Sequence, residues 1–522
     1  AQSSNAQVSS LIGGTGAIAG DSGENSGVLA TFGGSISNSA IAVTGNMVRG
    51  SAISNVGNNT MTVAATTLNG AGSTDQAIAD ADNVATTADY SLGNSQTLGA
   101  DATSTTNVYA TFGVDQALDN AVSNSSIAVS NNMQFGEALG NSAVNRLTLS
   151  ATSSGSGIDP TAALNSAQSG SGADIDSTSD MTLYANIASS GSSVALNGNS
   201  NTALGVINNA SNTASVSATT LDGSGATAYS SVVSNVTEAD YAVNNSQSAS
   251  GSLNSTAKTT ASNVDDALST TGLLNGSVSM SQNATTAEAS ANRVANSLSL
   301  AATSIDAAAG IGNEQVSNTS VTATAINSSY SFSLEANGST AFAASGSSLA
   351  VEGNSTTALA RGNSASNALN YTVGVTYSGT TLDASYGQYT VDAGAAVLNR
   401  QDNVGNVSAN ASNATYAIAL NDGTSGAASN ASASLRNNTV NAVAYGNTAN
   451  NNIAMSTFGA GVPSSAINNV QTNSGAVLAS ASGVAFSMTP TGAANGSALR
   501  NSGNSVSAQA VGNSAVSTIG GM

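Results

Sequence analysis

Short stretches of the chain alternate large apolar residues with small or polar ones, which is the period of a β-strand rather than of a helix. In 41–43 (Ile-Ala-Val) and 147–149 (Leu-Thr-Leu), the large side chains fall two residues apart. Such residues share one face of a sheet, so each stretch can bury that face. Asn-Gly dipeptides, which are typical of tight turns, punctuate these stretches. They are Asn69-Gly70, Asn197-Gly198, Asn275-Gly276, Asn337-Gly338 and Asn495-Gly496.

One segment recurs along the chain, and its first two copies, at 37–66 and 123–152, align without a gap. Successive copies are offset by 86, 67, 84, 71, 84 and 66 residues, so long and short units alternate and a pair of units is the true repeat. Three asparagines mark the frame of the repeat. They and their counterparts are Asn46, Asn55, Asn59, Asn132, Asn141, Asn145, Asn199, Asn208, Asn212, Asn283, Asn292, Asn296, Asn354, Asn363, Asn367, Asn438, Asn447, Asn451, Asn504 and Asn513.

The repeats predict the organisation of the chain and its fold class. We expect an N-terminal lead or assembly segment at 1–36, repeat modules at 37–189, 190–344 and 345–494, and a truncated repeat or cap at 495–522. A single unit has few large apolar residues, so neighbouring units must stack to form a continuous core. The sequence therefore predicts an all-β protein, built as a repetitive β-solenoid or a stacked β-sheet array.

Two interpretations fit the recurring asparagines. Identical side chains in stacked strands can form a ladder of hydrogen bonds along the stack. Alternatively, asparagine occupies turn corners, because it tolerates the left-handed backbone conformation. Both interpretations give these residues a structural role.

Composition excludes several classes of function. The chain has no Cys, His or Trp, and its 8 Lys and Arg against 28 Asp and Glu give a net charge of −20. Zinc sites of the Cys/His type, catalytic thiols and Ser-His-Asp triads are therefore absent. Nucleic acid is an unsuitable partner, because binding it requires many basic residues. No apolar run is long enough to span a bilayer.

The chain begins at Ala1, which predicts a mature protein after signal-peptide cleavage and a location outside the cell or at its surface. The segments 140–145 (GNSAVN) and 512–516 (GNSAV) resemble the Asn-, Ala- and Gly-rich strand repeats of curli-like fibre subunits and related β-strand-repeat surface proteins of Gram-negative bacteria. This resemblance implies a secreted, self-assembling extracellular fibre or anchor, and with it a bacterial source.

Metal and charge patterns offer few candidates. Asp174, Asp176 and Asp180 could bind a hard cation such as Ca²⁺, although solvated turn residues are the alternative. We expect no other cofactor. The eight basic residues do not coincide in the repeat frame, so we expect them to be isolated surface charges or subunit contacts.

These observations predict a structural protein rather than an enzyme. We expect a subunit of a secreted filament or biofilm matrix that assembles head to tail with copies of itself through open strand edges, which template further pairing. An outer-membrane secretion or anchoring partner would fit this role. The alternative is a monomeric surface adhesin or stalk that binds a glycan or a host surface. An enzyme acting on polysaccharide would need a carboxylate cleft, which the sequence does not display.

Overall fold

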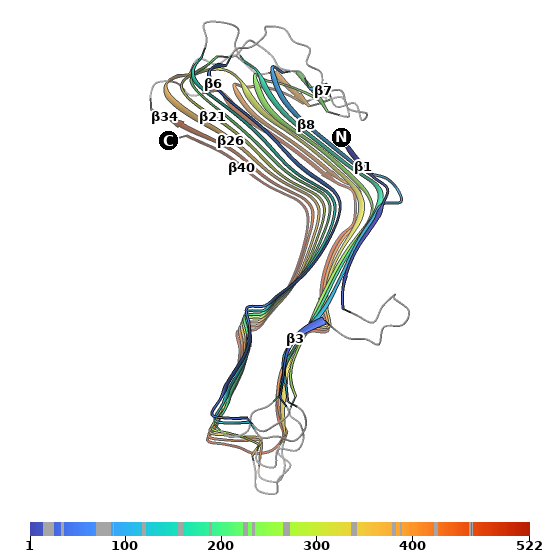
Figure 1. The fold of residues 1–522 in the computed structure, drawn as a ribbon, viewed down its shortest axis with the longest axis vertical. Helices are drawn as coiled ribbons and strands as arrows, with labels where there is room; N and C mark the ends of the chain where they lie inside the picture. The colour runs from blue at the N-terminus through green and yellow to red at the C-terminus, as the bar shows by residue number, and fades with distance from the viewer. Residues whose placement is uncertain are drawn as a thin grey trace.

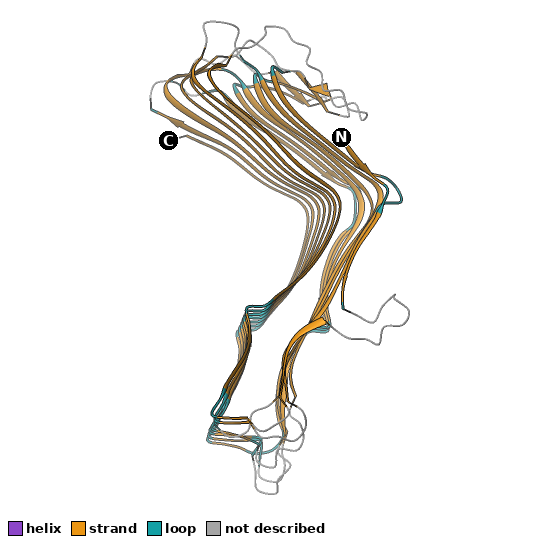
Figure 2. Cartoon of the chain, in the orientation of Figure 1, coloured by secondary structure: helices purple, strands orange, loops and turns teal. Residues whose placement is uncertain are grey.

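The computed structural model is all-β, as the sequence predicts, with long parallel strands stacked into sheets and no helix among the described residues (Figures 1 and 2). Strands follow one another because small and β-branched residues alternate along nearly the whole chain. The structure describes residues 1–13, 26–32, 36–68, 85–86, 88–116, 122–154, 160–186, 191–222, 228–231, 235–264, 272–335, 342–377, 383–386, 389–421, 426–458, 461 and 463–521.

Three large parallel sheets account for most of the molecule, and each repeat unit contributes to all three in turn. Sheet 1 contains β1 (Gln2–Ser4), β2 (Gln7–Ile12), β3 (Ser26–Phe32), β8 (Tyr90–Leu98), β9 (Thr103–Gln116), β13 (Ala162–Asn186), β18 (Tyr241–Val264), β22 (Ala309–Ile326), β23 (Ser329–Glu335), β29 (Ala395–Asn403), β30 (Val407–Ser412), β31 (Thr415–Asn421), β35 (Ser465–Asn473), β36 (Val477–Ser482) and β37 (Ala485–Pro490). Sheet 2 contains β5 (Ala40–Thr44), β11 (Ser126–Ser130), β14 (Ser193–Asn197), β20 (Ser277–Ser281), β25 (Ser348–Glu352), β33 (Ser432–Arg436) and β39 (Ala498–Ser502). Sheet 3 contains β6 (Met47–Leu68), β12 (Met133–Ser154), β15 (Ser200–Asp222), β21 (Ala284–Asp306), β26 (Ser355–Tyr377), β34 (Thr439–Thr457) and β40 (Ser505–Gly521).

We call the strands that one unit contributes to these sheets a rung, and number the rungs along the chain. They are β1–β6, β8–β12, β13–β15, β18–β21, β22–β26, β29–β34 and β35–β40. Two small parallel sheets lie between sheets 1 and 2, one of β4 (Ile36–Ser37) and β10 (Val122–Ser123), the other of β19 (Leu273–Leu274), β24 (Ala344–Ser345), β32 (Ala428–Ser429) and β38 (Ala494–Asn495).

Equivalent residues of successive units lie side by side in register. Asn141 on β12 is paired with Asn55 on β6 and with Asn208 on β15. The segments at the two ends of the chain join the same sheets. Residues of 1–36 pair with β8 and β9, and β40 pairs along its length with β34. The sequence offset between copies is therefore one step along the stack.

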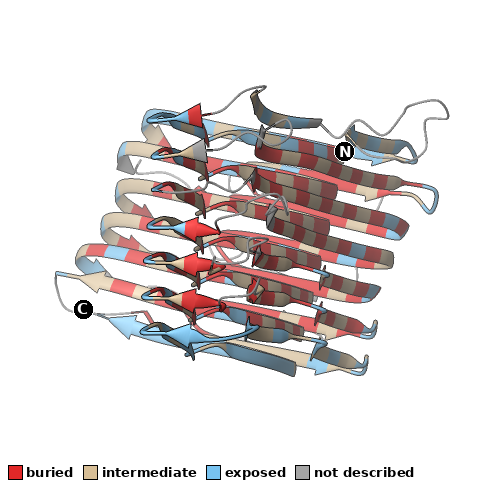
Figure 3. Ribbon diagram, turned by 90° about the horizontal axis from the view of Figure 1, so that it is seen from below, coloured by how far each residue is buried: buried red, intermediate tan, exposed pale blue. Residues whose placement is uncertain are grey.

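Sheets 1 and 3 face each other and bend together near the middle of each strand (Figure 1). At the bend of sheet 3 the pairing skips one residue on each strand, as at Gly140 and Ile207. Apolar side chains fill one core towards sheet 2 and a second core beyond the bend, around Leu147 and Tyr241. Burial alternates along the inner strands, whereas the last rung is largely exposed (Figure 3).

Two corners with left-handed backbone conformation flank every strand of sheet 2. The φ angles at these corners lie between 49° and 72°, a region that glycine and asparagine tolerate best. Asparagine or glutamine on one rung alternates with glycine on the next, apart from Asn38 and Asn124, which are neighbours. The first corner holds Asn38, Asn124, Gly191, Asn275, Gly346, Asn430 and Gly496, and the second holds Gly45, Asn131, Gly198, Gln282, Gly353, Asn437 and Gly503.

Sterics explain the alternation. A Cβ atom at Gly346 would clash with Asn275 Oδ1, and one at Gly198 would lie 2.6 Å from Asn131 Oδ1. The asparagine side chain thus occupies the space beside the next corner. The Asn-Gly dipeptides at 197–198, 275–276 and 495–496 lie at these corners, each of which joins strands of two different sheets and does not close a hairpin. Those at 69–70 and 337–338 lie outside the described residues.

Replacing Gly346 by alanine should lower the free energy of unfolding by about 3 kcal/mol, since the new Cβ combines a left-handed φ with a clash against Asn275. Gly353 on the same rung is the matched control, because its φ is similar but the nearest atom to a Cβ would lie 3.8 Å away. Gly353→Ala should cost about 1 kcal/mol. Equilibrium urea unfolding of both variants measures the difference, and equal losses would contradict the steric explanation.

Insertions that follow sheet 3 explain why long and short units alternate. The chain that follows sheet 3 in the first, third and fifth rungs contains the strands of an accessory antiparallel sheet, in the order β28-β27-β17-β16-β7. A two-stranded hairpin is about 9.6 Å wide, twice the ~4.8 Å between strands, so it covers two rungs of the stack. These strands are β7 (Ala85–Thr86), β16 (Ala228–Ser231), β17 (Asn235–Glu238), β27 (Asp383–Tyr386) and β28 (Tyr389–Asp392).

Candidate functional site

The recurring asparagines meet in ladders that run along the stack. In the first ladder each Nδ2 donates to the Oδ1 of the next rung at 2.9–3.0 Å, from Asn46 to Asn504. The same nitrogen also donates to a backbone carbonyl across the corner, as Asn132 does to Val43 at 2.9 Å. The members are Asn46, Asn132, Asn199, Asn283, Asn354, Asn438 and Asn504.

Two further asparagine ladders lie at the bend between sheets 1 and 3. In one, Nδ2···Oδ1 distances are 2.7–2.8 Å and the nitrogen also bonds a carbonyl of sheet 1, as Asn292 does to Val316 at 2.8 Å. The last ladder ends at Ser517, which replaces asparagine in the seventh rung. The members are Asn55, Asn141, Asn208, Asn292, Asn363, Asn447 and Asn513, then Asn59, Asn145, Asn212, Asn296, Asn367 and Asn451.

A glutamine ladder on sheet 1 was missed by the sequence analysis. Each Nε2 donates at 2.6–2.9 Å to the Oε1 of the preceding rung and at 2.8–3.1 Å to a carbonyl of sheet 3. An Asn-x-Gln pattern at 94–96, 245–247, 313–315, 399–401 and 469–471 was the available signal. The members are Gln2, Gln96, Gln168, Gln247, Gln315, Gln401 and Gln471.

The glutamine ladder and the two asparagine ladders at the bend form a polar layer between the two apolar cores. Asn208, Asn292 and Asn363 are fully buried, and each both accepts and donates within its ladder. A buried amide is costly unless its hydrogen bonds are made, whereas a network with every bond made fixes one register. The left-handed corners are occupied by other residues, so the two interpretations of asparagine apply to different positions.

The ladders are directional. Asparagine amides donate towards the C-terminal end of the stack, and glutamine amides donate towards the N-terminal end. Among the described residues, Asn55 Oδ1 in the first rung therefore accepts from no asparagine of a preceding rung, and Asn513 Nδ2 in the last rung donates to no asparagine of a following rung. In the glutamine ladder, which runs the other way, Gln471 Oε1 in the last rung is the acceptor without a ladder donor, and Gln2 Nε2 in the first rung is the donor without a ladder acceptor, among the described residues. The two end faces present complementary amide groups at equivalent positions.

Apolar side chains are more exposed at both end rungs than their counterparts inside the stack. On β6 Met61 and Val63 are half-buried, whereas the paired Leu147 and Leu149 on β12 are fully buried. On the last rung Ile519 is 48% exposed, whereas the paired Ile453 on β34 is fully buried. Covering these faces with a further rung would remove apolar surface from water.

The three candidate calcium ligands lie along one face of β13 but are not brought together. Each carboxylate accepts a hydrogen bond from β18: Asp174 from Ser252, Asp176 from Asn254 and Asp180 from Lys258, at 2.7–3.0 Å. At about 3.3 Å per residue, Asp174 and Asp180 are roughly 20 Å apart. No cluster of three metal-binding side chains occurs among the described residues. Calcium binding stays a prediction.

Most basic residues form ion pairs with a carboxylate of the adjacent rung. The sequence analysis had expected isolated surface charges or subunit contacts. The pairs are Arg49–Glu137 at 2.8 Å, Lys258–Asp180 at 3.0 Å, Arg361–Glu288 at 2.6 Å, Arg400–Glu314 at 3.3 Å and Arg436–Glu352 at 3.0 Å. Partly exposed pairs of this kind contribute little stability each, but they favour one register of the stack.

Stacked aromatic rings occupy the apolar core near sheet 2. Tyr416 lies between Tyr330 and Phe486, with ring centroids 5.4 and 5.1 Å apart. Burial raises the pKa of Tyr330 to about 12 and also raises that of Tyr416, because the phenolate would lose its water. Their hydroxyls hydrogen-bond Thr285 and Thr356 on sheet 3.

Comparison with known proteins identifies no relative: no family model, no curated protein and no solved structure matches the chain. No helix in the described part of the chain is long and apolar enough to cross a membrane.

Proposed function

We propose that the chain is a β-solenoid subunit of a secreted, curli-like extracellular filament or matrix, and that its role is structural rather than catalytic. Copies stack head to tail, with the last rung of one subunit against the first rung of the next. The complementary direction of the amide groups on the two end faces carries this proposal. Partly exposed apolar residues on both faces support it, because a further rung would bury them. The open edges of the parallel strands support it as well, because such edges template further pairing.

A continued ladder gives the junction its polarity. Asn513 would donate to Asn55 of the next subunit, and Gln2 of that subunit would donate back to Gln471. Asn504 would exchange its present acceptor, Asn501 Oδ1, for Asn46 Oδ1 of the next subunit. Such a contact is heterologous, so it generates an open fibre rather than a closed dimer. A monomeric adhesin is the alternative function, and it would leave both faces uncovered.

Ala508→Pro tests the junction without disturbing the fold. Ser505 N–H donates inward to Asn438 O. Successive residues of a parallel strand bond opposite neighbours, and Ala508 is an odd number of residues from Ser505, so the N–H of Ala508 points away from β34. Proline there removes an open-edge donor and fits the ends of a sheet. We expect a folded monomer that forms no filaments in negative-stain electron microscopy, whereas Ala508→Ser forms them. Filaments of normal length from the proline variant would contradict the proposed junction.

A further inference from the structure

Charge is distributed unevenly over this acidic chain. Four of its eight basic residues lie on sheet 3. The carboxylates within the strands of that sheet are Glu137 and Glu288, and two more, Asp222 and Asp306, are the last residues of β15 and β21. The basic residues are Arg49, Arg146, Arg293 and Arg361. Away from the strand ends, sheet 3 therefore carries an excess of positive charge in a protein whose net charge is −20.

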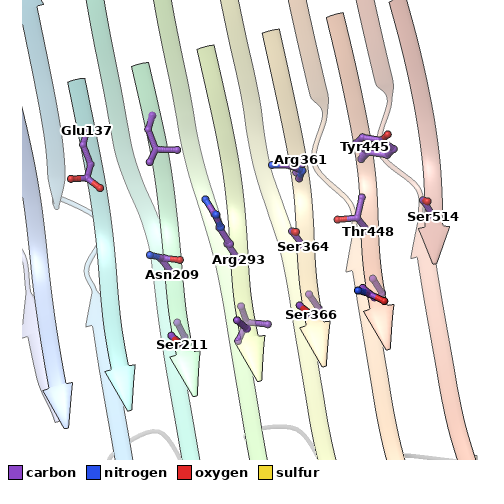
Figure 4. A pocket seen from close by; sticks show the side chains of 17 residues that line it. Glu137, Asn209, Ser211, Arg293, Arg361, Ser364, Ser366, Tyr445, Thr448 and Ser514 are labelled. Carbon is purple, nitrogen blue, oxygen red and sulfur yellow. The ribbon is translucent and has the colours of Figure 1, made fainter. Parts of the chain in front are cut away.

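A groove of about 830 Å³ lies at the bend in this sheet, on the face turned away from sheet 1 (Figure 4). The strands curve so that this face is the concave one (Figure 1). It runs along the stack and crosses successive strands from β12 to β40. Asn209, Arg293, Ser364 and Thr448 occupy one register position on four adjacent strands, so polar side chains recur along it about every 4.8 Å.

The glutamine ladder holds this row from the inside. The backbone carbonyls of Asn209, Arg293, Ser364 and Thr448 each accept a hydrogen bond from a ladder glutamine at 2.8–3.0 Å. The strand positions that line the groove are therefore fixed before any ligand arrives, which lowers the entropy lost on binding.

Two guanidinium groups that line the groove share one carboxylate, that of Glu288. Arg361 Nη1 lies 2.6 Å and Arg293 Nη1 lies 3.8 Å from the same Oε1 of Glu288. The arginine side chains are 24% and 49% exposed, and each guanidinium carries five N–H donors, so donors are left facing the groove. Tyr445 is next to Arg361 in register and lines the groove beside it (Figure 4).

We propose that this groove binds a linear polysaccharide that carries carboxylate groups. The arginine pair matches a carboxylate, since guanidinium binds it with two parallel hydrogen bonds. The evenly spaced amide and hydroxyl groups match the hydroxyls of an extended sugar chain lying along the stack, and the Tyr445 ring offers a surface for a sugar face. Because the groove belongs to one chain, this proposal does not depend on fibre formation.

Isothermal titration of the full chain with galacturonic acid oligomers of increasing length tests the proposal, with cello-oligosaccharides of equal length as the neutral probe. We expect the uronate oligomers to bind, with an affinity that rises with length and falls with salt. The double variant Arg293→Gln/Arg361→Gln should weaken binding about tenfold or more, the loss of one charged hydrogen bond or more. Arg436→Gln is the matched control, because Arg436 makes a similar ion pair on sheet 2, outside the groove, and should leave affinity unchanged.

Thermal unfolding of the variants checks that the fold is retained. If the double variant unfolds early, Tyr445→Ala provides a second substitution, expected to weaken binding of the same oligomers. Three results would overturn the proposal: no binding of the uronate oligomers, equal binding of the neutral oligomers, or unchanged affinity in folded groove variants.

Discussion

Deleting one repeat unit, residues 302–372, should destroy the native stack, whereas deleting the pair 302–456 should leave a folded, shorter protein. Both deletions join equivalent positions of sheet 3, because Ala301 pairs with Thr372 and Thr372 with Ser456. The strand sequences at the new junctions are therefore in register in both variants. The two variants differ in whether the hairpins and the Asn/Gly corners, which recur on every second rung, keep that spacing.

The single deletion removes the fifth rung and brings two hairpins together. The hairpin of β27 and β28 would then follow the fourth rung, directly beside the hairpin of β16 and β17 on the third. One strand spacing of about 4.8 Å would separate two insertions that are each about 9.6 Å wide. The pair deletion removes the second hairpin altogether, so no such overlap arises.

The corners of sheet 2 respond in the same way. After the single deletion Asn275 would meet Asn430, and Gln282 would meet Asn437, with no glycine between them. After the pair deletion the same residues meet Gly496 and Gly503, which repeats the native contact. We expect the pair variant to unfold cooperatively on heating and to resist proteolysis, and the single variant to do neither. Equal stability of the two variants would contradict the two-unit rule.

Asn292→Ala should lower the free energy of unfolding by about 4 kcal/mol. The side chain accepts from Asn208 at 2.8 Å and donates to Asn363 and to Val316 O, both at 2.8 Å. Its removal leaves buried partners without their bonds, at about 1–3 kcal/mol each, and opens a cavity where sheets 1 and 3 meet. Urea unfolding monitored by circular dichroism measures the loss.

An exposed asparagine on the same sheet provides the control. Asn450 lies on β34, and its side chain is exposed. Asn450→Ala should therefore change stability by no more than about 0.5 kcal/mol. A similar loss in both variants would mean that the ladder contributes no more than a surface amide does.

The period-2 pattern and the ungapped copies were sufficient to predict an all-β chain with stacked units. The position of the amide ladders also follows from the sequence, because identical asparagines at fixed offsets must meet when units stack in register. Gln2 and Gln168 lack the preceding asparagine that marks most of their ladder, so the repeat is weakest in sheet 1. That sheet is also interrupted at different places in different rungs, as between β8 and β9.

Contacts between non-equivalent residues could not be predicted from the repeat frame. Arg361 and Glu288 occupy different positions in their units, yet they meet because a long side chain reaches diagonally to the adjacent strand. The groove depends on a bend that arises where one residue is left out of the pairing, and no single residue type marks that point in every strand. Glycine occupies it at Gly140, Gly362, Gly446 and Gly512, but Ser54, Ile207 and Ala291 occupy it in the other three strands.

The spacing of the strands has an electrostatic consequence for the proposed fibre. Seven rungs about 4.8 Å apart advance roughly 34 Å, and the chain brings a net charge of −20 to that length. The axial charge density is then about one negative charge per 1.7 Å, close to that of duplex DNA. Such a filament is a polyelectrolyte surrounded by counterions. Neighbouring filaments would repel one another at low ionic strength, and multivalent cations would draw them into bundles.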